Sequence, residues 1–175
     1  MYVGMFSIMR CDHPDTAQYT EEWVNINEDM SPFDVVSLVY DGAHDIFYAA
    51  GSKYNNMWQC LAPESNSSWT AMRSGLADLA EFQSLAFDSD RDVLYASVFR
   101  GLASSRSTWS VFKCAMPGPS PTWIAIGTGL KSSIDMRSLI FDSAHNVLYG
   151  GSAAYGVWRY YPVQQKGSAP LCCIL

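Results

Sequence analysis

Charged residues are scarce in this chain, and basic residues are the scarcer kind. Asp, Glu, Lys and Arg make up 16% of the 175 residues, with 11 basic residues against 17 acidic ones. Binding to nucleic acid or to an anionic membrane surface relies on clustered Lys and Arg. The net charge of −6 therefore argues against both kinds of partner.

Long apolar runs are also absent. A transmembrane helix needs roughly 18 or more consecutive apolar residues, and no segment of the sequence approaches that length. The apolar stretch at residues 1–9 lacks the basic flank and the cleavage site of a signal peptide. We therefore expect neither a membrane span nor a leader in these residues.

The usual motifs of catalysis and metal binding are missing. The 3 histidines are far apart and have no metal-ligand spacing, and no Gly-x-Ser-x-Gly or glycine-rich phosphate motif occurs. Glycoside hydrolysis would need two carboxylates that converge at one centre. We expect the acidic candidates to lie in loops or flanks: Glu21, Glu22, Asp78 and Glu81. The sequence predicts a protein that is not an enzyme and uses no metal or other cofactor.

What the sequence does contain is a repeat. The motif Ser-Leu-x-aromatic-Asp occurs at residues 37–41, 84–88 and 138–142, at spacings of 47 and 54. Each copy is followed by a short polar turn and by a second strand that contains a tyrosine. Residues 1–4 resemble a fourth copy of this second strand. A period near 50 residues that is built from short strands is typical of a β-propeller.

Two further strand types complete each repeat. The third strand recurs at residues 8–11, 57–60, 111–114 and 157–160, and the fourth carries a tryptophan that we expect to pack between blades: Trp23, Trp69 and Trp123. The predicted fold is an all-β propeller with about four blade repeats of 46–54 residues, the first lacking its inner strand. The predicted units are residues 1–35, 36–82, 83–136 and 137–175 of a single domain, 1–175.

How such a ring closes stays open. Four blades could form a small ring, two chains could combine into a larger dimeric propeller, or the chain could be a slice of a longer protein. Open blade flanks would expose apolar surface, which favours closure or assembly. Of these arrangements a homodimer is the one we expect.

The cysteines follow the repeat rather than a disulfide pattern. Cys11, Cys60 and Cys114 occupy one position in successive repeats, where neighbours lie about 10 Å apart, beyond the roughly 7 Å that a disulfide allows between Cα atoms. Buried thiols in a reducing compartment such as the cytoplasm are expected. Residues 172–175 match a prenylation box on Cys172, although residues 171–175 also fit an outer strand of the last blade.

The Ser-Leu-x-Phe-Asp hairpin followed by a tryptophan strand resembles the Kelch and Asp-box types of propeller, over residues 1 to about 162. An Asp-box would read Ser-x-Asp-x-Gly-x-Thr-Trp, whereas residues 63–69 and 117–123 keep Ser or Thr before Trp without the Asp and Gly. The paired glycines of a Kelch repeat appear at residues 150–151. The resemblance implies the propeller architecture, and no sialidase or oxidase residues are carried over from it.

Two groups of residues are candidates for a role at the repeat positions and rims. Asp41, Asp88 and Asp142 each end a strand, where capping of the next turn is the expected role. The longest insertion, residues 99–110, is expected to form a rim loop that exposes Trp109 beside Arg106.

Three functional classes follow from these candidates. The first is a non-catalytic propeller that holds a protein partner on one rim patch around residues 99–110. The second is a lectin that stacks sugars on aromatics after the second strand of three blades: Tyr54, Phe99 and Tyr155. The third is a fragment of a glycan-active enzyme. The first class is the one that we expect.

Overall fold

The computed structural model describes residues 2–4, 8–11, 23–26, 34–52, 57–61, 68–72, 76, 80–102, 105–115, 121–126, 130 and 134–162. All regular elements in these residues are strands. They are β1 (Tyr2–Gly4), β2 (Ile8–Cys11), β3 (Trp23–Asn25), β4 (Val35–Asp41), β5 (Ile46–Gly51), β6 (Met57–Leu61), β7 (Trp69–Ala71), β8 (Ala80–Asp88), β9 (Val93–Leu102), β10 (Ser105–Ala115), β11 (Trp123–Ala125), β12 (Met136–Asp142), β13 (Val147–Ser152) and β14 (Gly156–Tyr160). No helix among the described elements could cross a bilayer.

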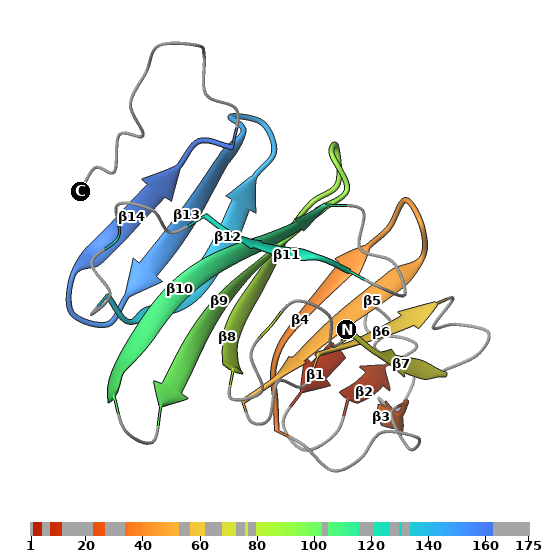
Figure 1. The fold of residues 1–175 in the computed structure, drawn as a ribbon. Coiled ribbons are helices and arrows are strands. Elements are labelled where there is room, and N and C mark those ends of the chain that lie inside the picture. The colour runs from red at the N-terminus through yellow and green to blue at the C-terminus, as the bar shows by residue number, and fades with distance from the viewer. Residues whose placement is uncertain are drawn as a thin grey trace.

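The strands form four antiparallel sheets, each made of strands that follow one another in the chain. The orders are β1-β2-β3, β4-β5-β6-β7, β8-β9-β10-β11 and β12-β13-β14. Figure 1 shows these sheets stacked in a row, and the inner strand β8 lies beside both β4 and β12. The expected all-β propeller of about four blades is confirmed, and the first sheet begins with the strand that is second in the other sheets.

The inner hairpins owe their geometry to the same turn residue in each repeat. Asp45, Asp92 and Asn146 adopt φ angles of 55°, 52° and 53°, in the left-handed region. Asp and Asn tolerate this region better than other residues with side chains, because their short polar groups bond locally. Asp or Asn at this repeat position therefore allows a tight turn in three equivalent hairpins, β4–β5, β8–β9 and β12–β13.

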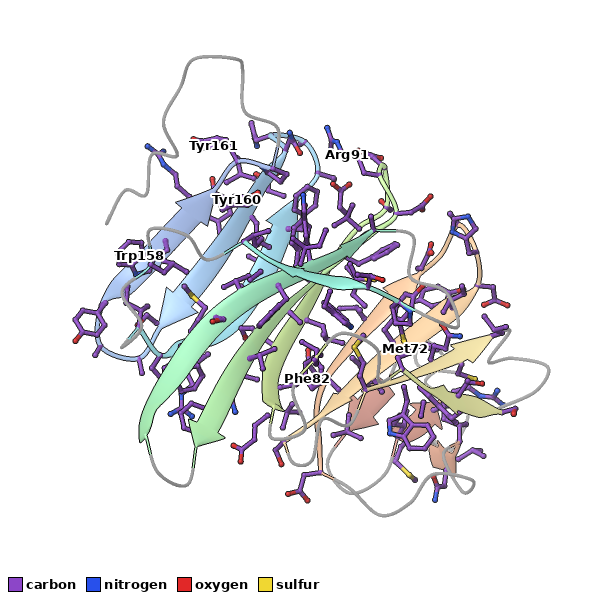
Figure 2. The ribbon with its side chains drawn as sticks, viewed as in Figure 1. Met72, Phe82, Arg91, Trp158, Tyr160 and Tyr161 are labelled. Atoms are coloured by element: carbon purple, nitrogen blue, oxygen red, sulfur yellow. The ribbon has the colours of Figure 1, made fainter. Side chains whose placement is uncertain are left out.

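The core consists of three apolar clusters between successive sheets. Tyr48 from β5, Met72 and Phe82 from β8 belong to the cluster between the second and third sheets. Figure 2 labels Met72 and Phe82 there. Tyr95 contributes to the next cluster, and both tyrosines are 1% exposed. Burial of such apolar faces against one another is the main contribution to the stability of the stack.

Polar contacts also join neighbouring sheets. The Oγ of Ser37 accepts a hydrogen bond from Leu85 N at 2.9 Å, and the Oγ of Ser84 accepts one from Leu139 N at 3.0 Å. The serine of each motif thus bonds the leucine of the following motif. The first two residues of the repeated sequence therefore fix the spacing of the inner strands.

The tryptophan strands also join sheets. Trp69 and Trp123 are buried, and the indole Nε1 of Trp69 donates to the carbonyl of Ile26 at 2.7 Å in the preceding sheet. Trp23 occupies the same register opposite Cys11 as Trp69 does opposite Cys60, but its side chain lies outside the described residues. The two fourth-strand tryptophans whose side chains are described pack toward the preceding sheet.

Two of the repeated cysteines are free, buried thiols, Cys60 and Cys114. Burial raises the pKa of Cys60 to about 11 and also raises the pKa of Cys114. These thiols are therefore protonated and unreactive at neutral pH. The side chain of Cys11, the expected outer strand at 171–175 and the prenylation site at Cys172 lie outside the described residues.

The four sheets form an open arc. In Figure 1 the β12–β14 sheet and the β1–β3 sheet lie at opposite ends of the row. Ile140 of the last sheet is 66% exposed, whereas Ala86, at the same repeat position in the third sheet, is 4% exposed. The described residues of this chain do not close the ring by themselves.

Candidate functional site

The longest hairpin of the molecule carries the main candidate site. Strands β9 and β10 have 10 and 11 residues, longer than the second and third strands of the other sheets. The sequence predicted a loop at residues 99–110, and this prediction was wrong, because most of the insertion continues the two strands. Trp109 therefore lies in strand β10, and its side chain is half-buried.

A row of three side chains crosses this extension. Trp109 on β10 pairs directly with Phe99 on β9, which pairs in turn with Glu81 on β8. Directly opposed residues of antiparallel strands point to the same face of a sheet. The rings of Phe99 and Trp109 lie 4.8 Å apart between centroids, with an angle of 44° between their planes.

The neighbouring sheet adds a cation to this row. The guanidinium carbon of Arg137, the second residue of β12, lies 5.3 Å from the centroid of the Trp109 ring. Its Nε forms an ion pair with Asp135 at 2.6 Å, and the Arg137 side chain is 58% exposed. A cation over an indole face is a favourable contact. We call Glu81, Phe99, Trp109, Arg137 and Asp135 the rim cluster.

The structure brings together two of the predicted binding residues and separates a third. Phe99 and Trp109 are in contact, while Tyr155 lies in the β13–β14 turn of the last sheet and is 45% exposed. Arg106 belongs to β10, but its side chain lies outside the described residues, as does all of Tyr54.

Three members of the rim cluster were missed or misplaced by the sequence reasoning. Glu81 was expected in a loop or flank, but it lies in β8, the inner strand of its sheet. Arg137 and Asp135 were not singled out. Their proximity to Trp109 depends on how β10 packs against the next sheet, which no local pattern in the sequence encodes. The other acidic candidates, Glu21, Glu22 and Asp78, lie outside the described residues.

The repeated aspartates form a second polar feature, at the inner hairpin turns. Asp41 Oδ1 accepts hydrogen bonds from Ala43 N at 3.0 Å and His44 N at 3.3 Å. Asp88 Oδ1 accepts one from Asp90 N at 3.1 Å. Each carboxylate also binds the side chain three residues on, as an aspartate that caps a turn commonly does.

These side-chain partners differ between repeats. Asp88 Oδ2 accepts a hydrogen bond from Arg91 Nη1 at 3.1 Å. Asp142 Oδ2 lies 2.7 Å from His145 Nδ1, and this bond is the largest of the causes that lower the pKa of Asp142. The side chains of Asp142 and His145 both reach solvent, so water can compete for this bond.

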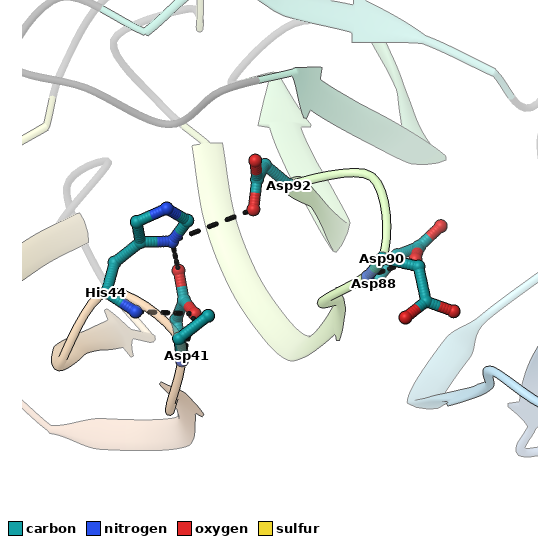
Figure 3. A network of polar contacts seen from close by, with 6 residues as sticks. Asp41, His44, Asp88, Asp90 and Asp92 are labelled. Carbon is teal, nitrogen blue, oxygen red and sulfur yellow. Dashed lines mark hydrogen bonds and ion pairs between the residues drawn. The ribbon is translucent and has the colours of Figure 1, made fainter.

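His44 connects two neighbouring turns. Its Nδ1 lies 2.8 Å from Asp41 Oδ2 and 3.7 Å from Asp92 Oδ1 in the next hairpin (Figure 3). The possible ligand atoms of these three residues lie within 4.8 Å of one another, so among the described residues this group could hold a cation. The short bond joins His44 Nδ1 to Asp41 Oδ2, and the more distant Asp92 belongs to the next hairpin. We therefore interpret the group as a contact between blades.

This contact predicts a pH-dependent property. The hydrogen bond to Asp41 and then the charges of Asp41 and Asp92 raise the pKa of His44. A group with a raised folded-state pKa contributes stability that is fully present below its unfolded pKa, about 6.5, and lost as the pH rises through the folded value. In an NMR titration of the imidazole, Asp41→Asn is expected to lower the pKa of His44 toward the ordinary value.

The matched variant for this titration is Asp92→Asn, which removes the smaller and more distant charge. Its effect on the pKa of His44 is expected in the same direction but weaker. An unchanged His44 pKa in Asp41→Asn would contradict the assigned contact.

Comparisons with known proteins show the fold of this chain but not its function. No family model matches the chain, and no curated protein is similar to it at a significant level. A chain in the crystal structure of a nidogen/laminin complex is 11% identical, with a TM-score of 0.67, over 98% of this chain and 59% of that one. An ancestral GH74 enzyme is 14% identical, with a TM-score of 0.65, over 96% of this chain and 22% of that one.

A third solved structure gives the same result. The GH74 xyloglucanase from Xanthomonas campestris is 12% identical, with a TM-score of 0.61, over 85% of this chain and 23% of that one. These are propeller-type proteins, and at such low identity the likeness shows the fold alone. The chain spans between 22% and 59% of the length of these three structures.

Proposed function

We propose that this chain is a non-catalytic binding propeller that holds a protein partner at the rim cluster. The observation that carries the proposal is the extended β9–β10 hairpin, where Phe99 and Trp109 lie in contact beneath Arg137. Trp and Arg are enriched among the residues that contribute most to protein–protein affinity. Rims of this kind, built on a rigid sheet, are where propellers usually carry their specificity.

The arrangement around Trp109 favours a protein over a sugar. Sugars stack on an open aromatic face, but one face of the Trp109 indole is covered by Arg137 and the ring also contacts Phe99. A sugar on that face would have to displace the cation–π contact. A peptide segment could instead place an acidic side chain on Arg137 and an apolar one beside Phe99.

A carbohydrate ligand remains the second candidate, for one specific reason. Trp109 and Tyr155 each precede a valine of the third strand by two residues, Val111 and Val157, so aromatics occupy matching positions in neighbouring blades. Repeated aromatics of this kind are what a lectin with several sites would use. The fold itself hosts binding proteins and glycan-active enzymes alike, so it does not distinguish the candidates.

Selection of peptides from a random display library on the intact chain tests the proposal. Peptides that bind are expected to lose about tenfold in affinity with Trp109→Ala and with Arg137→Ala, as hot-spot residues do. The matched control is Tyr155→Ala, an exposed aromatic in the neighbouring sheet, with which affinity should stay unchanged.

A glycan array run in parallel separates the two candidates. Glycan binding that is lost with both Trp109→Ala and Tyr155→Ala would support the lectin instead. Peptide binding that is insensitive to Trp109 and Arg137 would overturn the rim cluster as the partner site. The homodimer expected from the sequence is a separate prediction that these two experiments do not test.

A further inference from the structure

The long strand β10 extends past the strand that covers its outer edge. In the first three sheets, a backbone N–H just after the fourth strand donates to a carbonyl at one repeat position of the third strand. These pairs are Ile26 with Ile8, Met72 with Met57, and Ile126 with Val111. In the first two sheets the third strand begins at that position, whereas β10 already begins at Ser105. Residues 105–110 therefore continue β10 beyond the end of β11 (Figure 1).

The backbone of Trp109 points to this outer edge. The carbonyl of Val111 accepts Ile126 N from the β11 side at 2.8 Å. Backbone groups of successive residues in a strand point to opposite edges, so those of Trp109 point the same way as those of Val111. Among the described residues, no hydrogen bond to Trp109 N–H or C=O is found. One donor and one acceptor are thus directed away from β9 at the centre of the rim cluster.

The contact between the two aromatic rings agrees with this backbone direction. Trp109 lies opposite Phe99, and outward backbone groups make the two residues a non-hydrogen-bonded pair. Side chains approach each other more closely in pairs of this kind, as the 4.8 Å between the ring centroids shows. The rim cluster and the open edge are therefore two consequences of one register.

An open strand edge of this kind can bind an extended peptide through main-chain hydrogen bonds. Residues 105–110 contain no proline, so each of them keeps its N–H. The register between β9 and β10 shifts between Ser105 and Thr108. The regular part of the open edge is therefore centred on Trp109.

The side chains beside this edge favour an apolar residue at the centre of the peptide. Glu81, Phe99 and Trp109 form a row across three strands. A strand added to the edge of β10 would place one side chain next in this row, beside the Trp109 ring. Aromatic and β-branched residues are favourable cross-strand neighbours of an aromatic side chain.

Building on the proposed function, we propose that the protein partner binds as an extended segment that pairs antiparallel with β10 at Trp109. An aromatic or β-branched residue of the partner lies opposite Trp109. All strand pairings that the structure describes are antiparallel, and the added strand continues this pattern. A helical partner would leave the outward backbone groups of Trp109 without partners.

N-methylation of a bound peptide tests the strand pairing without altering the protein. The probe is a linear peptide from the display selection whose affinity for the intact chain falls about tenfold with Trp109→Ala. Its backbone nitrogens are methylated one at a time. Methylation should weaken binding about tenfold or more at nitrogens that donate to β10, and by less than about twofold at the intervening nitrogens, which are the matched controls.

Amide hydrogen exchange followed by NMR tests the same pairing on the protein. The N–H of Trp109 is expected to exchange at least about tenfold more slowly in the complex than in the free chain. The matched control is the N–H of Ser110, which is directed at Val98 of β9. Because Ser110 is bonded in both states, its exchange should slow less.

The outcomes separate the strand pairing from the proposed function. A peptide that depends on Trp109 and Arg137 but shows neither the alternating pattern nor protection of Trp109 N–H would overturn the strand pairing and leave the partner site in place. Protection of β14 amides instead, or a Trp109 N–H that is already protected in the free chain, would also overturn it. If no selected peptide depends on Trp109, the proposed function fails and the strand pairing fails with it.

Discussion

Replacing Phe82 with alanine is expected to lower the free energy of unfolding by about 3–5 kcal/mol, the range for deletion of a fully buried phenylalanine ring. Phe82 is 0% exposed and lies between the second and third sheets. Its ring is 6.3 Å from that of Trp123, measured between centroids.

Urea denaturation followed by tryptophan fluorescence measures this loss. The matched control is Phe99→Ala, which removes the same ring from the half-buried rim and should cost less than half as much, because less apolar surface is lost from the core. Equal losses for the two variants would contradict the assignment of Phe82 to the core of the stack. Changes in the denaturant slope would indicate that the transition is no longer two-state.

The stack of blades could be predicted from the sequence because its determinants are local and repeated. The Ser-Leu motif recurs at residues 37, 84 and 138, and the structure uses the first two of these serines to bond the following sheet. The tight turns likewise follow from Asp or Asn at one position. A feature that occurs three times in one chain distinguishes an architectural role from chance.

The rim cluster could be predicted only in part, because it occurs once and its geometry is non-local. Phe99 was a candidate as an aromatic that follows a second strand, and Trp109 as an aromatic of the insertion. Their cross-strand pairing depends on a register that begins at the hairpin tip, with a shift between Ser105 and Thr108. Arg137 reaches Trp109 from the next sheet. Nothing in the spacing of residues 109 and 137 encodes that contact.

The contact of His44 with Asp92 was missed for the same reason. His44 lies in the polar turn that follows the first Ser-Leu motif, and its side chain is 53% exposed. What the sequence could not show is that the next turn brings Asp92 within 3.7 Å of the imidazole. Stacking places equivalent turns side by side, so residues 48 positions apart become neighbours.

The repeated aspartates allow one substitution, Asp to Ala, to be compared at a buried position and at a partly exposed one. Asp88→Ala is expected to lower the free energy of unfolding by about 1–3 kcal/mol, the cost of leaving bonded polar groups without their partner. The Asp88 side chain is 0% exposed and accepts a hydrogen bond from Asp90 N (Figure 3). It accepts a second one from Arg91 Nη1. Without the carboxylate, the backbone N–H of the turn loses its acceptor and the guanidinium loses its counter-charge.

Asp142→Ala is the matched control, because the residue has the same motif position and the same kind of turn. Its side chain is 32% exposed, so water can replace the carboxylate as a partner of His145. Parallel urea titrations of the two variants should therefore give a clearly larger loss for Asp88→Ala. The lowered pKa of Asp142 adds a second distinction, since its bond to His145 weakens as the pH falls through that pKa. Equal losses of unfolding free energy at neutral pH would mean that burial of the aspartate does not determine how much its turn hydrogen bonds stabilise the protein.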